Sequence, residues 1–298
     1  MTALELRWMR GDAPYMAIAT QGLLTVLAPS DPGVTARWST VVGAPTLVLE
    51  TTLDAGQIAQ TMLDAPLPDV AAVAWPTRDP QALGPSLATT EDPQAAYRLL
   101  LETSGETERR LLRAIATDQV VDANGVPART RLLRGAKSDL SAFGRLRRTT
   151  AAALEAELRD GPDFRPGKSG TMLGLVPEVQ TFGGTTGREA SGVGAESALL
   201  ARLLRHGILA LPPTSAVQRG GRRVGGPLIS DDRELSWPRW SVPCGPKALR
   251  VLLGLASIHV SHPKPEALRA TGIDAVFRAA PQQLSTTVSV FRWGRRVA

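Results

Sequence analysis

Hydrophobic and polar residues alternate in several short stretches near the start of the chain. Leu4, Leu6 and Trp8 occupy every second position, and the same period recurs in residues 34–40 and 46–51. A period of two places successive side chains on opposite faces of a β-strand, so that one face can be buried while the other is solvated. The pattern therefore predicts three half-buried strands.

Between and after these stretches, apolar residues recur every three or four positions, which is the period of an amphipathic helix. Asp12 and Pro14 are start signals for a first helix, and Asp54 is a start signal for a second. Residues 69–75 are apolar enough to form a fourth strand. The order strand, helix, strand, strand, helix, strand predicts an α+β fold that begins with a ferredoxin-like βαββαβ unit at residues 1–75.

The next two regions differ in composition. Residues 76–92 are rich in Pro, Gly and Thr and are predicted to form a linker. Region 93–160 is arginine-rich and combines helical periodicity, interrupted near Gly105, with an Asn-Gly pair at 124–125 between two β-prone runs. Such a pair is typical of a hairpin turn, and Ser138 is a start signal for a further helix.

The last region, residues 161–298, is predicted to be a C-terminal α+β region of mixed helices and antiparallel strands. A leucine-rich helix at 196–207 precedes an apolar run at 208–213, which we interpret as a buried strand, and a glycine-arginine loop follows at 218–227. A second leucine-rich helix at 248–255 and two strands near the C-terminus complete the prediction.

The net charge of +6 is distributed unevenly along the chain. Residues 109–148 contain ten arginines and lysines but three aspartates, so this segment carries +7 and the rest of the chain carries −1. A localised positive field attracts polyphosphate backbones and releases their counterions. Two interpretations remain open, because these arginines can also lie on a solvated helix face or pair with carboxylates elsewhere in the fold.

Arginines are the candidate contacts for nucleic acid, because the guanidinium fork matches phosphate oxygens geometrically. The glycines of the 218–227 loop let its backbone approach a strand of phosphates, although the same loop can also be a disordered hairpin tip. Trp237 and Trp240 are more typical of core anchors than of base-stacking platforms. The candidate nucleic-acid-binding residues are Arg129, Arg131, Arg134, Arg145, Arg147, Arg148, Arg219, Arg222 and Arg223.

Sequence motifs for catalysis are weak. Gly167, Lys168 and Ser169 resemble the end of a phosphate-binding loop, but Pro162 occupies the position of the required first glycine. Proline lacks an amide donor, and a predicted helix precedes the segment instead of a strand, so we interpret it as a turn. Cys244 is the only cysteine, which excludes an intrachain disulfide and argues against a zinc cluster.

Two histidines and one acidic cluster are the remaining candidates for chemistry. His259 and His262 lie three positions apart, but a metal site needs at least a third ligand. Asp231, Asp232 and Glu234 form the densest acidic cluster, beside an arginine in a predicted turn. We therefore expect no catalytic residue, no cofactor and no bound metal, and a metal-dependent hydrolase or nuclease is the less favoured alternative.

Targeting signals are also weak. The longest apolar stretches are far shorter than the about 20 residues that a spanning helix needs, and the N-terminus lacks a basic start followed by an apolar run. The sequence therefore predicts a cytoplasmic protein without a membrane partner.

Two blocks of the sequence resemble proteins encoded with subtype I-G (formerly I-U) CRISPR–Cas systems. The first block contains APYMAIATQGLLTVLA at 13–28, ARW at 36–38 and LVLETTLDAGQIAQTML at 47–63. The second contains LLARLLRHGILALPP at 199–213 and ELSWPRWSVPCGPKALRVLLGL at 234–255. The arginine-rich middle of the chain is not covered by these blocks.

This resemblance implies a large-subunit-like component, or an accessory, of a crRNA-guided surveillance complex. In such assemblies the protein contacts the nucleic-acid backbone while base pairing reads the sequence. The expected partners are DNA or crRNA and other effector subunits, and no catalytic residues are implied. A protein–protein adaptor, whose arginines pair with acidic partners instead of nucleic acid, remains the main alternative.

Overall fold

The computed structural model shows a mixed α/β fold with antiparallel three-stranded sheets. The described residues are 2–13, 16–39, 45–67, 75–77, 87–121, 125–129, 149–161, 197–213, 216–219, 222–225, 234–260, 262–283, 289–291 and 294–298. Within these ranges, no helix has the length and apolar character needed to cross a bilayer.

The N-terminal sheet follows from the alternating pattern of the sequence. Its strands β1 (Thr2–Arg10), β2 (Thr35–Trp38) and β3 (Thr46–Thr51) are antiparallel and lie in the order β1-β3-β2. Burial alternates along β3, where Leu47 and Leu49 are fully buried and their neighbours are half-buried. The three strands predicted from the two-residue period are therefore confirmed.

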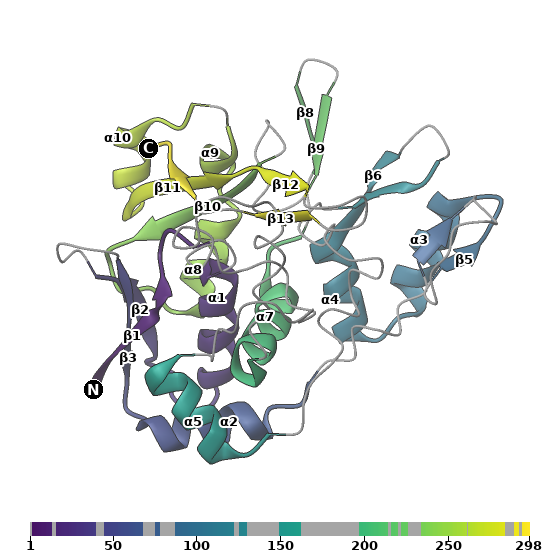
Figure 1. Cartoon of the computed structure of the whole chain (residues 1–298). Coiled ribbons are helices and arrows are strands. Elements are labelled where there is room, and N and C mark those ends of the chain that lie inside the picture. The colour runs from purple at the N-terminus through teal and green to yellow at the C-terminus, as the bar shows by residue number, and fades with distance from the viewer. Residues whose placement is uncertain are drawn as a thin grey trace.

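Helix α1 (Met16–Leu27) lies at the centre of the core, and every residue in it except Thr25 is buried. Figure 1 shows α1 between the N-terminal sheet and helix α7 (Ala198–Ala210). The backbones of α1 and α7 touch at Gly22 and Gly207, where any side chain would collide with the facing helix. A helix that is surrounded on all sides has no need of a polar face, which explains its apolar and small residues.

Helix α2 (Ala55–Asp64) begins where the sequence predicts it. The carboxylate of Asp54 accepts a hydrogen bond from the Gln57 backbone N–H, and the Gln57 side chain accepts one from the Asp54 N–H. This reciprocal pair is a capping box, which satisfies two N–H groups at the helix start. α2 packs against α5 (Ala151–Asp160), and the indole of Trp8 joins α5 to β1 by donating to a backbone carbonyl at 3.1 Å.

The C-terminal region forms a second sheet, which contacts the N-terminal sheet. Its strands β10 (Leu235–Trp240), β11 (Ile273–Ala279) and β14 (Arg295–Arg296) are antiparallel, in the order β10-β11-β14. Trp237 and Trp240 on β10 are fully buried. Their indole N–H groups donate to carbonyl oxygens of the turn after β1 and of β2, at 3.0 and 2.8 Å. Both tryptophans are therefore core anchors, as predicted.

The remaining elements surround this core. The helices are α3 (Pro93–Thr103), α4 (Glu106–Ile115), α8 (Pro246–Leu253), α9 (Ala256–His259) and α10 (Pro265–Arg269). The two-stranded pairs are β4 (Trp75–Thr77) with β5 (Leu87–Thr89), β6 (Ala116–Val121) with β7 (Pro127–Arg129), β8 (Ala216–Arg219) with β9 (Arg222–Gly225), and β12 (Pro281–Gln283) with β13 (Ser289–Phe291). Figure 1 shows α3, α4 and β6 at one side of the core and the β8–β9 hairpin projecting from it.

The predicted break and hairpin of region 93–160 are confirmed. Helix α3 ends just before Gly105 and α4 begins just after it. Strands β6 and β7 are antiparallel, and Gly125 between them has a φ of 72°. This is the left-handed region that glycine adopts without steric cost. The helix predicted from Ser138 lies outside the described residues until α5 begins.

Two local predictions are wrong. Helix α1 begins at Met16, and Asp12 does not cap it but binds the side chain of Arg10 at 2.9 Å. The buried strand predicted at 208–213 is instead the last turn of α7 followed by prolines. A short apolar run has no period that separates a strand from a helix, and here the preceding helix simply continues through it.

The ferredoxin-like unit also needs a fourth strand beside β1. Residues 69–74 of the predicted strand 69–75 lie outside the described residues. Trp75 belongs to β4, which pairs in parallel with β5. Because β5 falls within the predicted linker at 76–92, that interval contains a paired strand.

Candidate functional site

Arg219, Arg222 and Arg223 lie on a β-hairpin, in a segment that the sequence predicts as a loop or a hairpin tip. Strands β8 and β9 are antiparallel, with Arg219 opposite Arg222 and Gln218 opposite Arg223. The register therefore places three of the predicted contacts at one end of the hairpin.

The β6–β7 hairpin lies beside the β8–β9 hairpin. Strand β6 contacts both β8 and β9, and Arg129 at the end of β7 pairs with Ala116 at the start of β6. The fold thus brings Arg129 and the arginines of β8 and β9, which are far apart in the sequence, onto neighbouring hairpins (Figure 1). We call β6–β7 and β8–β9 together the arginine hairpins.

The other predicted contacts lie outside the described residues: Arg131, Arg134, Arg145, Arg147 and Arg148. They follow β7 along the chain, so the segment that carries them starts at the arginine hairpins. Earlier arginines of the same basic segment bind within the fold. Arg109 donates to the carbonyl oxygens of Leu101 and Ser104 at the end of α3, and Arg110 pairs with Glu106 at 2.8 Å. Part of the local positive charge therefore stabilises α3 and α4.

The residues considered for catalysis are not brought together among the described ranges. The carboxylate of Glu234 binds Arg295 at 2.8 Å, and residues 231–232 lie outside the described residues. His259 is half-buried, with Nε2 3.3 Å from a carbonyl oxygen of α8, whereas His262 is exposed. In the part of the chain that the structure describes, no three His, Cys, Asp or Glu side chains lie close enough to hold a metal ion.

A cleft of about 800 Å³ opens where the ends of four helices meet. It is bounded by the C-terminal parts of α1, α2 and α7 and by the first turns of α4. The lining residues are Thr25, Val26, Pro29, Ser30, Thr61, Asp64, Ala65, Pro66, Leu67, Thr107, Arg110, His206, Leu209 and Ala210. This size is typical of pockets that hold small organic ligands.

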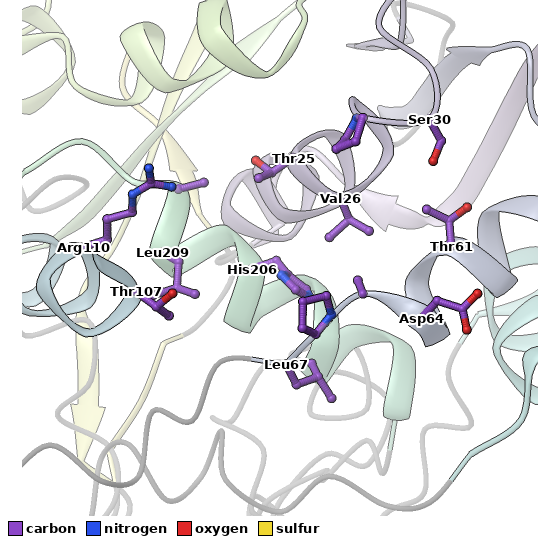
Figure 2. Close-up of a pocket in the computed structure, with 14 residues that line it drawn as sticks. Thr25, Val26, Ser30, Thr61, Asp64, Leu67, Thr107, Arg110, His206 and Leu209 are labelled. Atoms are coloured by element: carbon purple, nitrogen blue, oxygen red, sulfur yellow. The ribbon is translucent and has the colours of Figure 1, made fainter. Parts of the chain in front are cut away.

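The cleft has a positive side and a negative side. Figure 2 shows Arg110 of α4 at one side and Asp64 of α2 at the other, with Val26, His206 and Leu209 between them. The N-terminus of α4 adds partial positive charge to the side of Arg110, because unpaired N–H groups point out of a helix start. The ends of α1, α2 and α7 add partial negative charge elsewhere in the cleft.

His206 is neutral at pH 7, although it is the central polar side chain of the cleft. Burial, together with the charges of Arg202 and Arg205, lowers the pKa of His206 to about 4. Its Nε2 is buried and has no hydrogen-bond partner among the described residues. Arg202 is also buried and donates to a backbone carbonyl of α2 at 3.2 Å, which links α7 to α2 behind the cleft.

Sequence patterns do not predict this cleft, because its walls come from four helices that are distant along the chain. The sequence does mark two of the helix ends that line the cleft, each with a proline. Pro29 and Pro66 follow α1 and α2 closely, and each lines the cleft. Proline lacks the N–H that would bond to the preceding turn, so it ends a helix and leaves a carbonyl oxygen available.

The arginine hairpins and the cleft are the features from which a function can be inferred. Comparison of the chain with protein-family models, with curated proteins and with solved structures finds no match.

Proposed function

We propose that this protein is a non-catalytic, cytoplasmic subunit of a subtype I-G CRISPR surveillance complex of the Cascade type, and that its arginines hold a DNA or RNA backbone. One observation carries the proposal of nucleic-acid binding. The β6–β7 hairpin, which bears Arg129, lies beside the β8–β9 hairpin, which bears Arg219, Arg222 and Arg223, through contacts of β6 with β8 and β9. The assignment to the CRISPR complex is supported by the two sequence blocks that resemble subtype I-G proteins.

A nucleic-acid backbone suits this arrangement physically. A single strand carries one phosphate about every 3.4 Å in duplex geometry, so a row of arginines on adjacent strands can meet successive phosphates. Each guanidinium can bind one phosphate with two parallel hydrogen bonds. The contacts are to the backbone and therefore tolerate any base sequence, as a guide-directed complex requires.

The ferredoxin-like unit at residues 1–75 is part of the same proposal. It is supported by the antiparallel order β1-β3-β2 and by the positions of α1 and α2 after β1 and β3. Residues 69–74 would supply the fourth strand, beside β1, because Trp75 already pairs with β5. Hydrogen exchange tests this directly, since backbone N–H groups of a paired strand at 69–74 exchange slowly and those of an unpaired segment exchange fast.

The test of nucleic-acid binding replaces Arg219, Arg222 and Arg223 together with alanine. Fluorescence anisotropy with labelled single-stranded and duplex DNA at roughly 0.1 M salt should show binding about tenfold weaker or more, because each charged hydrogen bond is worth on the order of 1 kcal/mol or more. The matched control replaces Arg7, Arg159 and Arg250, which are exposed on β1, α5 and α8. This control loses the same charge but should bind nearly as well as the parent protein.

Three results would count against the proposal in different ways. Equal weakening in both triple variants would show that net charge, and not the arginine hairpins, drives binding. Binding to acidic effector subunits without affinity for any nucleic acid would favour the protein–protein adaptor. Metal-dependent strand cleavage that is lost on mutating Asp231, Asp232 and Glu234, or the histidines, would establish a hydrolase or nuclease.

A further inference from the structure

The two sides of the cleft carry groups that can bind opposite ends of one ligand. Arg110 uses its Nε to pair with Glu106, and its terminal NH1 and NH2 groups have no hydrogen-bond partner among the described residues. Thr107, one turn earlier on α4, adds a hydroxyl and a helix N-terminus. Although Glu106 and Glu108 also lie in this first turn, the NH1 and NH2 groups of Arg110 and the Thr107 hydroxyl can together bind one anion such as a phosphate.

The opposite side offers acceptors. Asp64 accepts a hydrogen bond from Gln60 through Oδ1 at 2.8 Å, and its second carboxylate oxygen faces no donor in the described part of the chain. An ionised carboxylate can only accept hydrogen bonds. The ligand group that reaches Asp64 must therefore be a donor, such as an amino group.

The floor between these sides suits a flat, uncharged ring. Val26 and Leu209 are apolar, and His206 between them is a neutral imidazole at pH 7 (Figure 2). An aliphatic and imidazole surface can pack against the face of a heterocycle without the desolvation cost that a charged group would impose. A ligand with a phosphate, a flat ring and an exocyclic amino group matches all three parts of the cleft.

The cleft is also connected to the arginine hairpins by short elements. Helix α4 begins at the cleft and continues without a break into β6, and its ten residues are about 15 Å long. Helix α7 lines the cleft with its last turn, and β8 begins six residues after Ala210. A strand that lies on the arginine hairpins is therefore within a few nucleotides of the cleft.

We propose that the cleft receives one unpaired nucleotide of the strand held by the arginine hairpins, with its phosphate at Arg110 and Thr107 and its exocyclic amino group at Asp64. This inference rests on the proposed function. Adenine, cytosine and guanine carry an exocyclic amino group, whereas thymine and uracil do not. The cleft therefore prefers an amino-bearing base at one position of an otherwise sequence-independent contact.

The test compares a strand of about twelve thymidines with strands in which one central thymidine is replaced by deoxycytidine or deoxyadenosine. The parent protein should bind the substituted strands about threefold tighter or more, because thymine offers only its ring N3–H and lacks the exocyclic amino donor that is placed to reach Asp64. Asp64→Ala, which removes both acceptor oxygens, should abolish this preference while the affinity for the all-thymidine strand changes no more than in the control. Asp160→Ala, which removes another exposed carboxylate with the same charge, should keep the preference.

A second readout does not depend on the Asp64 variant. A 2-aminopurine placed at the central position becomes more fluorescent when it leaves the stack of its neighbours, so binding should raise its emission. Ala210→Trp, which fills the cleft, should abolish this rise while the strand still binds. Unfolding of the variant in urea, compared with that of the parent protein, shows whether it is folded.

The outcomes separate the two proposals. If all strands bind equally and Arg219→Ala/Arg222→Ala/Arg223→Ala weakens them all, the cleft does not hold a base and the proposed function stands. If Asp64→Ala keeps the preference, the cleft is likewise excluded. If no strand binds, both proposals are wrong. If the preference is lost in Asp64→Ala and kept in the weakened arginine variant, both are supported.

Discussion

The contact between α1 and α7 allows a stability prediction from measured distances. A Cβ atom on Gly22 would lie 1.8 Å from the carbonyl oxygen of Leu203, and one on Gly207 would lie 2.0 Å from that of Ile18. Carbon and oxygen atoms in proteins rarely approach closer than about 3.3 Å. Gly22→Ala therefore requires the two helices to separate by about 1.5 Å.

The cost of this separation follows from general magnitudes. Overpacking a filled core costs about 1–3 kcal/mol, and a gap of about 1 Å removes up to half of the dispersion energy of the facing atoms. The colliding groups here are backbone atoms, which cannot rotate away, so the upper end of the range applies. The higher helix propensity of alanine offsets about 1 kcal/mol of this loss in unfolding free energy. The expected net loss is about 2 kcal/mol or more of unfolding free energy for Gly22→Ala.

Urea unfolding followed by tryptophan fluorescence measures this loss, because Trp237 and Trp240 are buried in the native state. Gly56→Ala in α2 is the matched control, since its Cβ would meet no atom closer than 3.4 Å. This variant should be as stable as the parent protein or up to about 1 kcal/mol more stable. The double variant Gly22→Ala/Gly207→Ala should lose less than the sum of the two single losses, because one separation relieves both collisions.

Unchanged stability of Gly22→Ala would refute the backbone contact. A loss in Gly56→Ala as large as that in Gly22→Ala would instead show that the chain tolerates no added methyl group in any helix. Either result would remove the basis for the close approach of α1 and α7 at Gly22.

Further predictions concern buried ionisable groups. Burial lowers the pKa of both His206 and His259 to about 4, whereas the unfolded chain titrates near the ordinary histidine value. The unfolded state therefore binds more protons between about pH 6.5 and pH 4, and the unfolding free energy should fall over that interval by on the order of 2 kcal/mol per histidine. Urea titrations at several pH values check this, and His206→Gln/His259→Gln should flatten the profile. Asp31→Ala removes the acceptor of the Thr51 hydroxyl at 2.6 Å and of a backbone N–H at 2.7 Å. The same assay should show a loss of about 3 kcal/mol, against about 0.5 kcal/mol or less for the exposed Asp160→Ala.

Local elements were predictable from the sequence where one physical cause dominates. The alternation at 46–51 gives β3 its bounds, because every second residue must be buried. Asp54 starts α2 because its carboxylate satisfies a free N–H group, and the glycine at 125 turns the β6–β7 hairpin through its positive φ. These signals act within a few residues and do not depend on the rest of the fold.

Predictions failed where a tertiary contact competes with the local signal. Asp12 resembles a helix cap, but its carboxylate forms an ion pair with Arg10, two residues earlier. Ile208 and Leu209 resemble a strand, but α7 continues through them and packs them against α1 and the cleft. The glycines of the 218–227 segment left a loop and a hairpin tip open, and the pairing of β8 with β9 shows a hairpin.

The candidate sites were predictable only in part. Clustering along the chain identified the arginines, but their position on two adjacent hairpins depends on contacts between β6 and the β8–β9 pair. The cleft depends on how four helix ends meet, and the close approach of α1 and α7 depends on Gly22 facing Gly207. The spacing of hydrophobic residues along one helix does not indicate which residue of another helix each of them faces.

The salt dependence of nucleic-acid affinity tests directly whether the arginines of the β8–β9 hairpin bind phosphates. Each phosphate contact contributes about 0.7 to the slope of log affinity against log salt for a single strand and about 0.9 for a duplex. Replacing Arg219, Arg222 and Arg223 with alanine should therefore lower the slope for single-stranded DNA by about 2. A slope that is the same in the triple variant and the parent protein would contradict the account, because it would mean that the hairpin arginines touch no phosphate.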